Sequence, residues 1–168
     1  ALSTKFFIII FIFKIITMKI SSLARIYFPS KIELGSTLSP ATEQSHYLIN
    51  VLRFKNGEKV RIFNEASGEY IALIKIVSKK ACELEVIELF RQNNPLPILC
   101  LAQCIIKGDR MMQIIDMATQ LGATEIQPII SSRTQIRTIN EDRYHKCLIE
   151  SSEQSERLSI PGLSSPVS

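Results

Sequence analysis

Several features are scarce in this 168-residue chain, and each scarcity narrows what the protein can be. The four cysteines form no Cys-x-x-Cys pair and have no histidine at a spacing that suits zinc, which argues against a metal site and favours reduced, half-buried thiols. The longest apolar run, Phe6 to Phe13, ends at Lys14, well short of the roughly 20 residues that a membrane-spanning helix needs. The first half has only Tyr27, Tyr47 and Tyr70 as tyrosines, which argues against a dedicated single-strand-binding surface.

The net charge of +4 is small and unevenly distributed. Residues 1–17 carry +2, residues 18–94 carry +3, and residues 95–168 carry −1. Only the middle segment is therefore an electrostatic candidate for nucleic-acid binding, and its excess is modest. Because 46% of the residues are apolar, the chain has enough material for a packed core, and we expect a globular fold.

Residues 1–17 do not fit the pattern of the rest of the chain. Lys5 and the apolar run after it are compatible with a signal peptide, for which Ser22-Leu23-Ala24 is a passable cleavage site. Met18, however, stands just before a sequence that begins a soluble domain. We therefore expect Met18 to be the true start and residues 1–17 to be an apolar leader or non-native extension of a cytoplasmic protein that does not associate with a membrane; export is the alternative.

Short alternating segments fill residues 18–90. The predicted strands are Arg25–Phe28, Lys59–Phe63, Glu69–Val77 and Cys82–Leu89. A single helix is predicted over Thr42–Leu52, and its buried face should carry Tyr47, Leu48, Val51 and Leu52. Closely spaced strands with one helix are typical of a small β-barrel. The polar, proline-bearing segment 91–97 predicts a linker to a second domain, residues 98–168.

The candidates for contacting an RNA backbone in the first domain are Arg25, His46, Arg53, Lys55 and Arg61. Arginine and lysine supply most nucleic-acid affinity through the phosphates. Alternatively, Arg53 and Lys55 are the solvated end of a helix, where cations suit the dipole, and His46 is structural. Spacing alone favours the structural interpretation.

The second domain is predicted to open with a strand, a helix and a strand. An apolar run over Pro97–Ile106 is a buried strand, Asp109 is an N-cap candidate, and Gly122 is a natural helix stop. A second strand is expected over Glu125–Ile130, where Pro128 should keep it from a central place in the sheet. Such a unit almost always forms a right-handed parallel crossover, which predicts an α/β fold. Its ligand-binding edge would carry Ser131, Ser132 and Arg133.

One more helix is expected after Asn140, its N-cap candidate. The face predicted to pack comprises Tyr144, Cys147, Leu148, Ser151, Ser155 and Leu158. Glu150, Glu153, Gln154 and Arg157 project polar groups from the same turns. A general base at Glu150 or Glu153 is conceivable, but glutamate on a helix near arginine is far more often a solvated or ion-paired surface. The tail from residue 159 to residue 168 is expected to be irregular.

Taken together, these residues resemble a known family. His46-Tyr-Leu-Ile-Asn-Val-Leu-Arg53 and Ser67-Gly-Glu-Tyr70 resemble the first domain of the RsmE family, bacterial 16S ribosomal RNA uridine-N3 methyltransferases. Lys107-Gly-Asp-Arg-Met111, Ala118-Thr-Gln-Leu-Gly122 and Ile149-Glu-Ser-Ser-Glu-Gln-Ser-Glu-Arg157 resemble the second. The resemblance runs in order from about residue 25 to residue 161. It implies a PUA-like RNA-binding barrel, a SPOUT α/β domain with a C-terminal trefoil knot, S-adenosylmethionine as methyl donor, and a homodimer acting on 16S rRNA or the small ribosomal subunit.

The chain also departs from the family. The Gly-Pro-Glu-Gly-Gly and Leu-Arg-x-Glu-Thr-Ala segments that form the cofactor-binding knot do not occur, so we expect a C-terminally truncated, inactive fragment that holds no cofactor-binding residue. In addition, Glu156 stands where the family usually has glycine, and Ser151-Ser152 where it usually has two alanines. No catalytic residue can be named. A non-catalytic RNA-binding module is the alternative.

The resemblance and the polarity of the side chains together give a set of site residues. We expect RNA contacts from Arg25, His46, Arg53 and Arg133. The cleft toward the knot would be lined by Glu150, Gln154 and Arg157.

Overall fold

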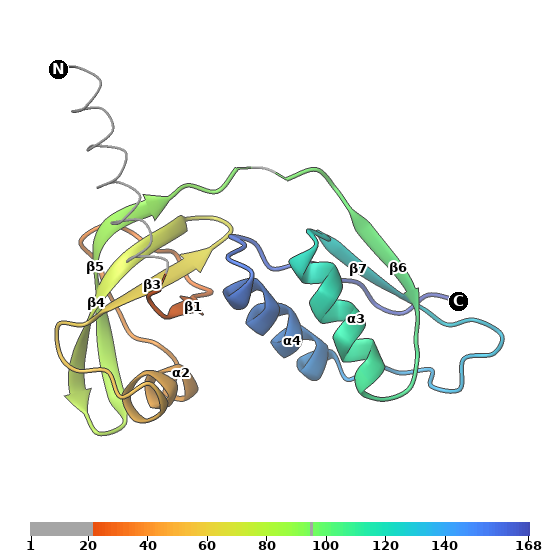
Figure 1. Ribbon diagram of the computed structural model, residues 1–168, viewed down its shortest axis with the longest axis horizontal. Coiled ribbons are helices and arrows are strands. Elements are labelled where there is room, and N and C mark those ends of the chain that lie inside the picture. The colour runs from red at the N-terminus through yellow and green to blue at the C-terminus, as the bar shows by residue number, and fades with distance from the viewer. Residues whose placement is uncertain (1–21, 95) are drawn as a thin grey trace, which may run out of the picture.

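The computed structural model describes residues 22–94 and 96–168, so the expectations for residues 1–17 and Met18 lie outside the described residues. Two parts lie side by side (Figure 1). Strands β1 to β5 form the first, and a smaller sheet with helices α3 and α4 forms the second, while the linker passes along one side of both. Within these residues, no helix is both long and apolar enough to cross a membrane.

The first part is a curved five-stranded sheet in the order β1-β3-β4-β5-β2. Its strands are β1 (Arg25–Tyr27), β2 (Thr37–Leu38), β3 (Lys59–Asn64), β4 (Gly68–Ser78) and β5 (Ala81–Arg91). Strand β1 runs parallel to β3 and the other pairs are antiparallel. Register shifts between β4 and β5 bend the sheet, as bulges do. The expected small barrel and its four predicted strands are confirmed, and β2 is added to them.

The barrel core lies inside this curved sheet. Its fully buried side chains include Leu48, Val60, Ile62, Ala72 and Leu84. Strand β3 would be expected to bury one face only, because successive side chains point to opposite faces. All its residues after Lys59 are buried, however, because on the outer face Arg61 bonds to Glu156 just after α4 and Phe63 packs against Arg25 and Tyr27 of β1. Strand β3 thus contributes one face to the barrel core and the other to the interface with the second part.

The predicted helix over residues 42–52 is present but not regular. It consists of α2 (Thr42–His46) and a π-helical turn η1 (Tyr47–Val51), in which Leu52 N donates to Tyr47 O. A π turn holds more residues than an α turn, so the buried face moves along the chain. Leu48 is buried as predicted, but the predictions for Tyr47 and Val51 were wrong, since these side chains are 43% and 57% exposed.

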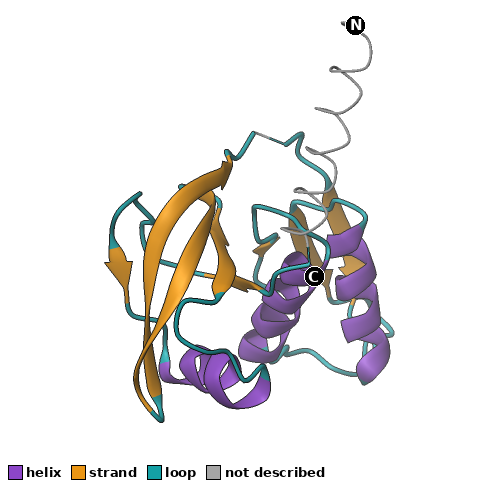
Figure 2. Cartoon of the chain, turned by 60° about the vertical axis from the view of Figure 1, so that its left-hand side comes forward, coloured by secondary structure: helices purple, strands orange, loops and turns teal. Residues whose placement is uncertain are grey.

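The second part is a three-stranded parallel sheet in the order β6-β7-β8. Its elements are β6 (Cys100–Cys104), α3 (Asp109–Gln120), β7 (Glu125–Ile129), α4 (Glu141–Gln154) and β8 (Gly162–Leu163). Both helices lie on the same side of the sheet (Figure 2). The predicted parallel crossover is therefore confirmed. The core between helices and sheet is built from Met111, Ile115, Ile126, Tyr144 and Leu148.

Details of the second part differ from expectation. The N-cap of α3 is Gly108, with Asp109 as the first helical residue, whereas Asn140 caps α4 as predicted by accepting from Arg143 N at 2.9 Å. The expected irregular tail supplies β8. Strand β7 is the central strand, so the prediction that Pro128 would keep it from this place was wrong. Proline has no N–H to donate, but its carbonyl still accepts from Val167 N at 3.1 Å, beyond the end of β8.

The sheet face opposite the helices is uncovered in the described residues. Cys100 and Cys104 on β6 are exposed, Cys147 is intermediate and Cys82 is buried. All four cysteines are free thiols, as predicted, but only Cys147 is half-buried as expected, since Cys82 lies in the barrel core and the two cysteines of β6 are exposed. The difference follows from β6, whose outward side chains have no second layer to pack against.

Candidate functional site: the interdomain junction and the basic end of the barrel

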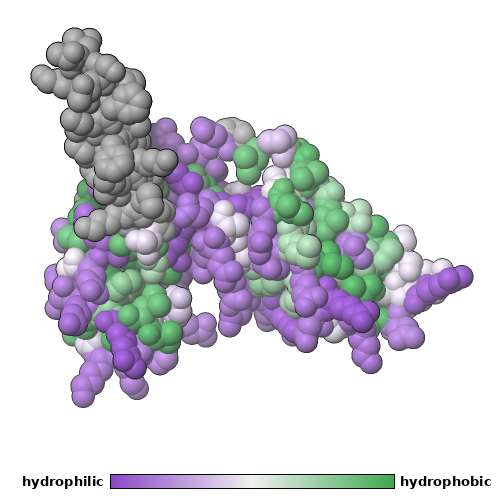
Figure 3. All heavy atoms as spheres, viewed as in Figure 1, coloured by the Kyte–Doolittle hydropathy of each residue, from purple (hydrophilic) through white to green (hydrophobic). Residues whose placement is uncertain are grey.

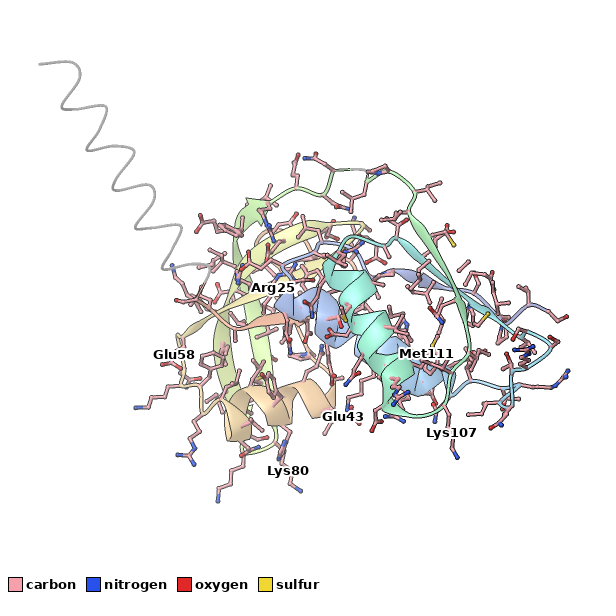
Figure 4. The ribbon with its side chains drawn as sticks, turned by 45° about the vertical axis from the view of Figure 1, so that its right-hand side comes forward. Arg25, Glu43, Glu58, Lys80, Lys107 and Met111 are labelled. Carbon is pink, nitrogen blue, oxygen red and sulfur yellow. The ribbon has the colours of Figure 1, made fainter. Side chains whose placement is uncertain are left out.

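The first site residue, Arg25, lies between the barrel and α4 (Figure 4). Its Nε donates to Glu69 Oε1 at 2.6 Å, and its Nη1 donates to Ser152 O at 2.7 Å. Its Nη2 donates to Arg157 O, and the guanidinium stacks 3.5 Å from the centroid of the Phe63 ring. Burial lowers the pKa of Arg25, and the adjacent Glu69 opposes that shift. The guanidinium expected to face RNA is engaged by protein groups here.

Glu69 is the carboxylate at the centre of this junction, and it is fully buried on β4. Arg91 on β5 donates to its Oε2 through Nε at 2.7 Å and lies 2.6 Å from it through Nη2. Arg61 on β3 approaches Glu69 Oε1 at 3.5 Å. Three arginines from three strands thus surround one carboxylate, an arrangement that neither composition nor spacing indicated.

The end of α4 completes the junction. Glu156 accepts from Arg61 Nη2 through Oε1 at 2.8 Å, and its backbone carbonyl accepts from Arg91 Nη2 at 2.9 Å. The hydrogen bond from Arg61 holds the pKa of Glu156 below its ordinary value, although partial burial opposes the shift. Glu156 has a φ of +59°, the left-handed conformation that favours glycine. This is the conformation that glycine, the residue expected here from the sequence resemblance, would adopt without strain.

A cleft of about 1390 Å³ separates α4 from β1 and α2 beside this junction (Figure 3). Glu150 and Gln154, both expected to line a cleft, are on its wall. The acidic side chains that line it are Glu43, Glu65, Glu141, Asp142, Glu150, Glu153 and Glu156. The acids outnumber the lining cations Arg25, Arg61 and Lys146, so an RNA backbone is not expected to lie within the cleft.

Glu153 joins the cleft to the barrel. Its Oε1 accepts from Tyr27 N at 2.8 Å, which places a carboxylate of α4 against the backbone of β1. Burial raises the pKa of Glu153, and the Tyr27 N–H and the charge of Arg25 only partly offset the shift. The side chain therefore serves as a backbone acceptor at the junction.

Arg157 does not line the cleft with Glu150 and Gln154. Its Nη1 donates to Thr119 O at 2.7 Å and to Ala123 O at 2.6 Å, so it ties the end of α4 to the turn after α3. Burial lowers its pKa. Its surroundings are backbone carbonyls of its own domain.

The end of the barrel away from α4 is rich in cations. The exposed side chains that form this basic end are Arg53, Lys55, Lys59, Lys75, Lys79 and Lys80. The turns bring them together, because Gly57 N donates to Ile74 O and Asn56 accepts from Ile76 N. Among the described residues of these strands, Glu58, Glu83 and Glu85 oppose them, and Lys80 projects from the barrel in Figure 4. Lys75, Lys79 and Lys80 could not be grouped with Arg53 from the sequence, because they are far from it along the chain.

The remaining predicted contacts are also exposed. His46 is the last residue of α2. Arg133 lies beyond the carboxyl end of β7, where it lines a small pocket of about 270 Å³ with Cys104, Lys107 and Thr134. Arg25, by contrast, is buried at the junction, so the structure does not bring the four predicted RNA contacts together. Within residues 22–94 and 96–168, no group of three or more His, Cys, Asp or Glu side chains is placed to hold a metal.

Comparisons with known proteins agree with this architecture. An RNA methyltransferase PUA domain matches residues 40–87, and an RNA methyltransferase domain matches residues 92–168. The ribosomal RNA small subunit methyltransferase E of Rickettsia conorii is 40% identical over 138 residues, covering 82% of this chain and 57% of the relative. That of Bacillus subtilis is 30% identical over 138 residues, covering 78% and 54%.

Solved structures are similar as well. A methyltransferase from Legionella pneumophila, with S-adenosylmethionine bound, has a TM-score of 0.78 at 31% identity, covering 86% of this chain and 63% of its own. A ribosomal RNA small subunit methyltransferase E from Neisseria gonorrhoeae, also bound to S-adenosylmethionine, has a TM-score of 0.77 at 26% identity, covering 86% and 62%. The chain spans little more than half the length of these curated relatives. With a PUA-like barrel followed by a SPOUT-type α/β domain, it belongs to the family of RNA methyltransferases that includes the ribosomal RNA small subunit methyltransferases E.

Proposed function

We propose that this chain carries the RNA-binding domain and the first part of the catalytic domain of an enzyme that methylates N3 of a uridine in 16S rRNA, with S-adenosylmethionine as the donor. The observation that carries the proposal is the order of the two matched domains, together with 40% identity to the Rickettsia relative over 82% of the chain. The chain would then bind the small ribosomal subunit or its rRNA, in the cytoplasm. A homodimer is part of the same proposal.

The basic end of the barrel is the proposed RNA-facing surface. Its six exposed cations lie near three carboxylates, whereas acidic side chains outnumber basic ones in the lining of the interdomain cleft. Phosphate contacts from lysine and arginine release counterions, so binding should weaken steeply with salt. Arg133 is proposed as a contact from the second domain, since it is exposed beyond the carboxyl end of β7, where ligands of α/β sheets bind.

The described residues do not by themselves fit the methyl donor. The pocket at the carboxyl ends of β6 and β7 encloses about 270 Å³, below the roughly 300–1,000 Å³ of small-molecule sites. Its lining supplies no wall beyond the two strand ends and the segments that follow them. The residues present are therefore assigned to RNA binding and positioning alone.

Filter binding of the purified chain to 16S rRNA tests the proposal. The double variant Lys79→Ala/Lys80→Ala should weaken binding and reduce the salt slope by about one to two, because one counterion is released for each phosphate contact. The matched control is Lys31→Ala, which removes an exposed lysine paired to Glu33 away from the basic end. Equal affinities for the double variant and the control would contradict the assignment of the surface.

A second candidate function is a non-catalytic RNA-binding module. The small pocket at the ends of β6 and β7 favours this function for the polypeptide by itself. If it is correct, calorimetry should detect no binding of S-adenosylmethionine. A micromolar dissociation constant would exclude the module and support a complete cofactor site. Sedimentation of the same sample tests the proposed homodimer.

A further inference from the structure

The junction between barrel and α4 carries more positive than negative charge inside the barrel. Arg25, Arg61 and Arg91 share Glu69, whose side chain has no exposed surface, while those of Arg25 and Arg61 are 3% exposed. Strand register makes the cluster possible, because Arg25 is the partner of Arg61 and Glu69 is the partner of Arg91. One carboxylate cannot satisfy so many buried donors, and unpaired buried charge is strongly unfavourable.

The missing acceptors come from the other domain. Arg25 donates to the carbonyls of Ser152, Glu153 and Arg157, and Arg91 donates to that of Glu156. The last carbonyls of a helix have no partner within the helix and carry its negative dipole end. The barrel therefore supplies donors to the end of α4, where Ser152 O also accepts from Arg157 N at 3.2 Å, and this end supplies acceptors for Arg25 and Arg91.

We infer that Glu69 and its three arginines are positioning residues that hold the barrel and α4 in one orientation. Glu69 aims the guanidinium groups, and the fork of Arg25 then fits the helix end in a way that a single ammonium does not. The inference extends the proposed function, because the basic end of the barrel and Arg133 can contact one rRNA site together only if their separation is fixed. Losing the junction would leave both surfaces intact but not preorganised.

The test measures orientation directly. Spin labels at Lys31→Cys on the barrel and Gln113→Cys on α3 report the interdomain distance by double electron–electron resonance, with Cys100 and Cys104 replaced by serine. A single narrow distribution is expected without further changes. Arg25→Ala should broaden it and Arg25→Lys should broaden it less, while circular dichroism stays the same. The control Glu65→Ala removes an exposed carboxylate at the cleft whose side chain accepts from Tyr27 Oη within the barrel, and it should leave the distribution narrow.

If Arg25→Ala does not fold, the same distance measurement is made on the double variant Arg91→Ala/Glu156→Ala. Both of its side chains are partly exposed, so this variant should fold. A narrow distribution in a folded junction variant overturns the inference. Affinity for 16S rRNA, measured on unlabelled protein, should fall about 3- to 10-fold in the same variants with an unchanged salt slope. A broadened distribution with unchanged affinity would support the junction and contradict the proposed shared rRNA site.

Discussion

Arg61 Nη2 donates to Glu156 Oε1 at 2.8 Å, although Glu156 occupies the left-handed conformation in which a side chain is strained. The carboxylate is 41% exposed and the arginine 3% exposed, so the pair spans the rim of the junction. An ion pair with the barrel thus accompanies a backbone geometry that glycine would adopt more readily.

Substitution at Glu156 should separate these two effects. Glu156→Gly removes about 1–2 kcal/mol of left-handed strain and about 1 kcal/mol of partly screened ion pair, so its free energy of unfolding should stay near that of the unchanged chain. Glu156→Ala keeps the strain and loses the pair, so it should be about 1 kcal/mol less stable. Urea denaturation measures both, and an alanine variant as stable as the glycine variant would contradict the strain.

Acid should weaken the same contact. The pKa of Glu156 lies below its ordinary value of 4.5 in the folded chain, so its stabilisation is present above about pH 4.5 and is lost as the pH falls through the lowered value. Glu156→Gln lacks this dependence. The difference in unfolding free energy between the two proteins should therefore shrink below pH 4.5, and a difference that stays constant to pH 3 would refute the pairing.

Glu153 should behave in the opposite way. Burial raises its pKa, so the charged form is disfavoured in the folded chain at neutral pH and the penalty disappears as the pH falls below the raised value. Glu153→Gln keeps an oxygen that accepts from Tyr27 N. We expect a modest gain in stability at pH 7 and none at pH 4, measured by thermal unfolding at both values.

The irregular helix gives a prediction about packing. Leu48→Ala should cost about 2–5 kcal/mol because the side chain is fully buried in the barrel core. Tyr47→Ala should cost much less, since that ring is 43% exposed. Denaturation of the two variants tests which side chains the π turn buries. Equal losses of unfolding free energy would support the regular helix predicted from the sequence instead.

Much of the fold could be predicted because local patterns and topology agree. Alternation marked β3, β4 and β5, and the apolar run, helix and strand around Gly122 marked the parallel crossover. The π turn could not be predicted, because apolar residues at Tyr47 and Val51 fit a regular helix equally well. Strand β8 has only two residues, and its pairing with β7 follows from tertiary packing.

The candidate site was harder to predict than the fold. Arg25 and Arg53 have the same residue type, yet one is buried beneath α4 and the other is exposed at the basic end. Burial by another domain leaves little local trace. The available signal was Glu69, a charge next to Gly68 at the start of an apolar strand, which indicates a buried ion pair once its strand partners are known.

The most direct test of the account asks whether both domains contact one rRNA site. Photocrosslinkers attached at Ala81→Cys, beside Lys80, and at Ser132→Cys, beside Arg133, would be activated on small ribosomal subunits. Both positions should crosslink to 16S rRNA within a single site. Crosslinks to ribosomal proteins alone, or to two unrelated rRNA regions, would contradict it.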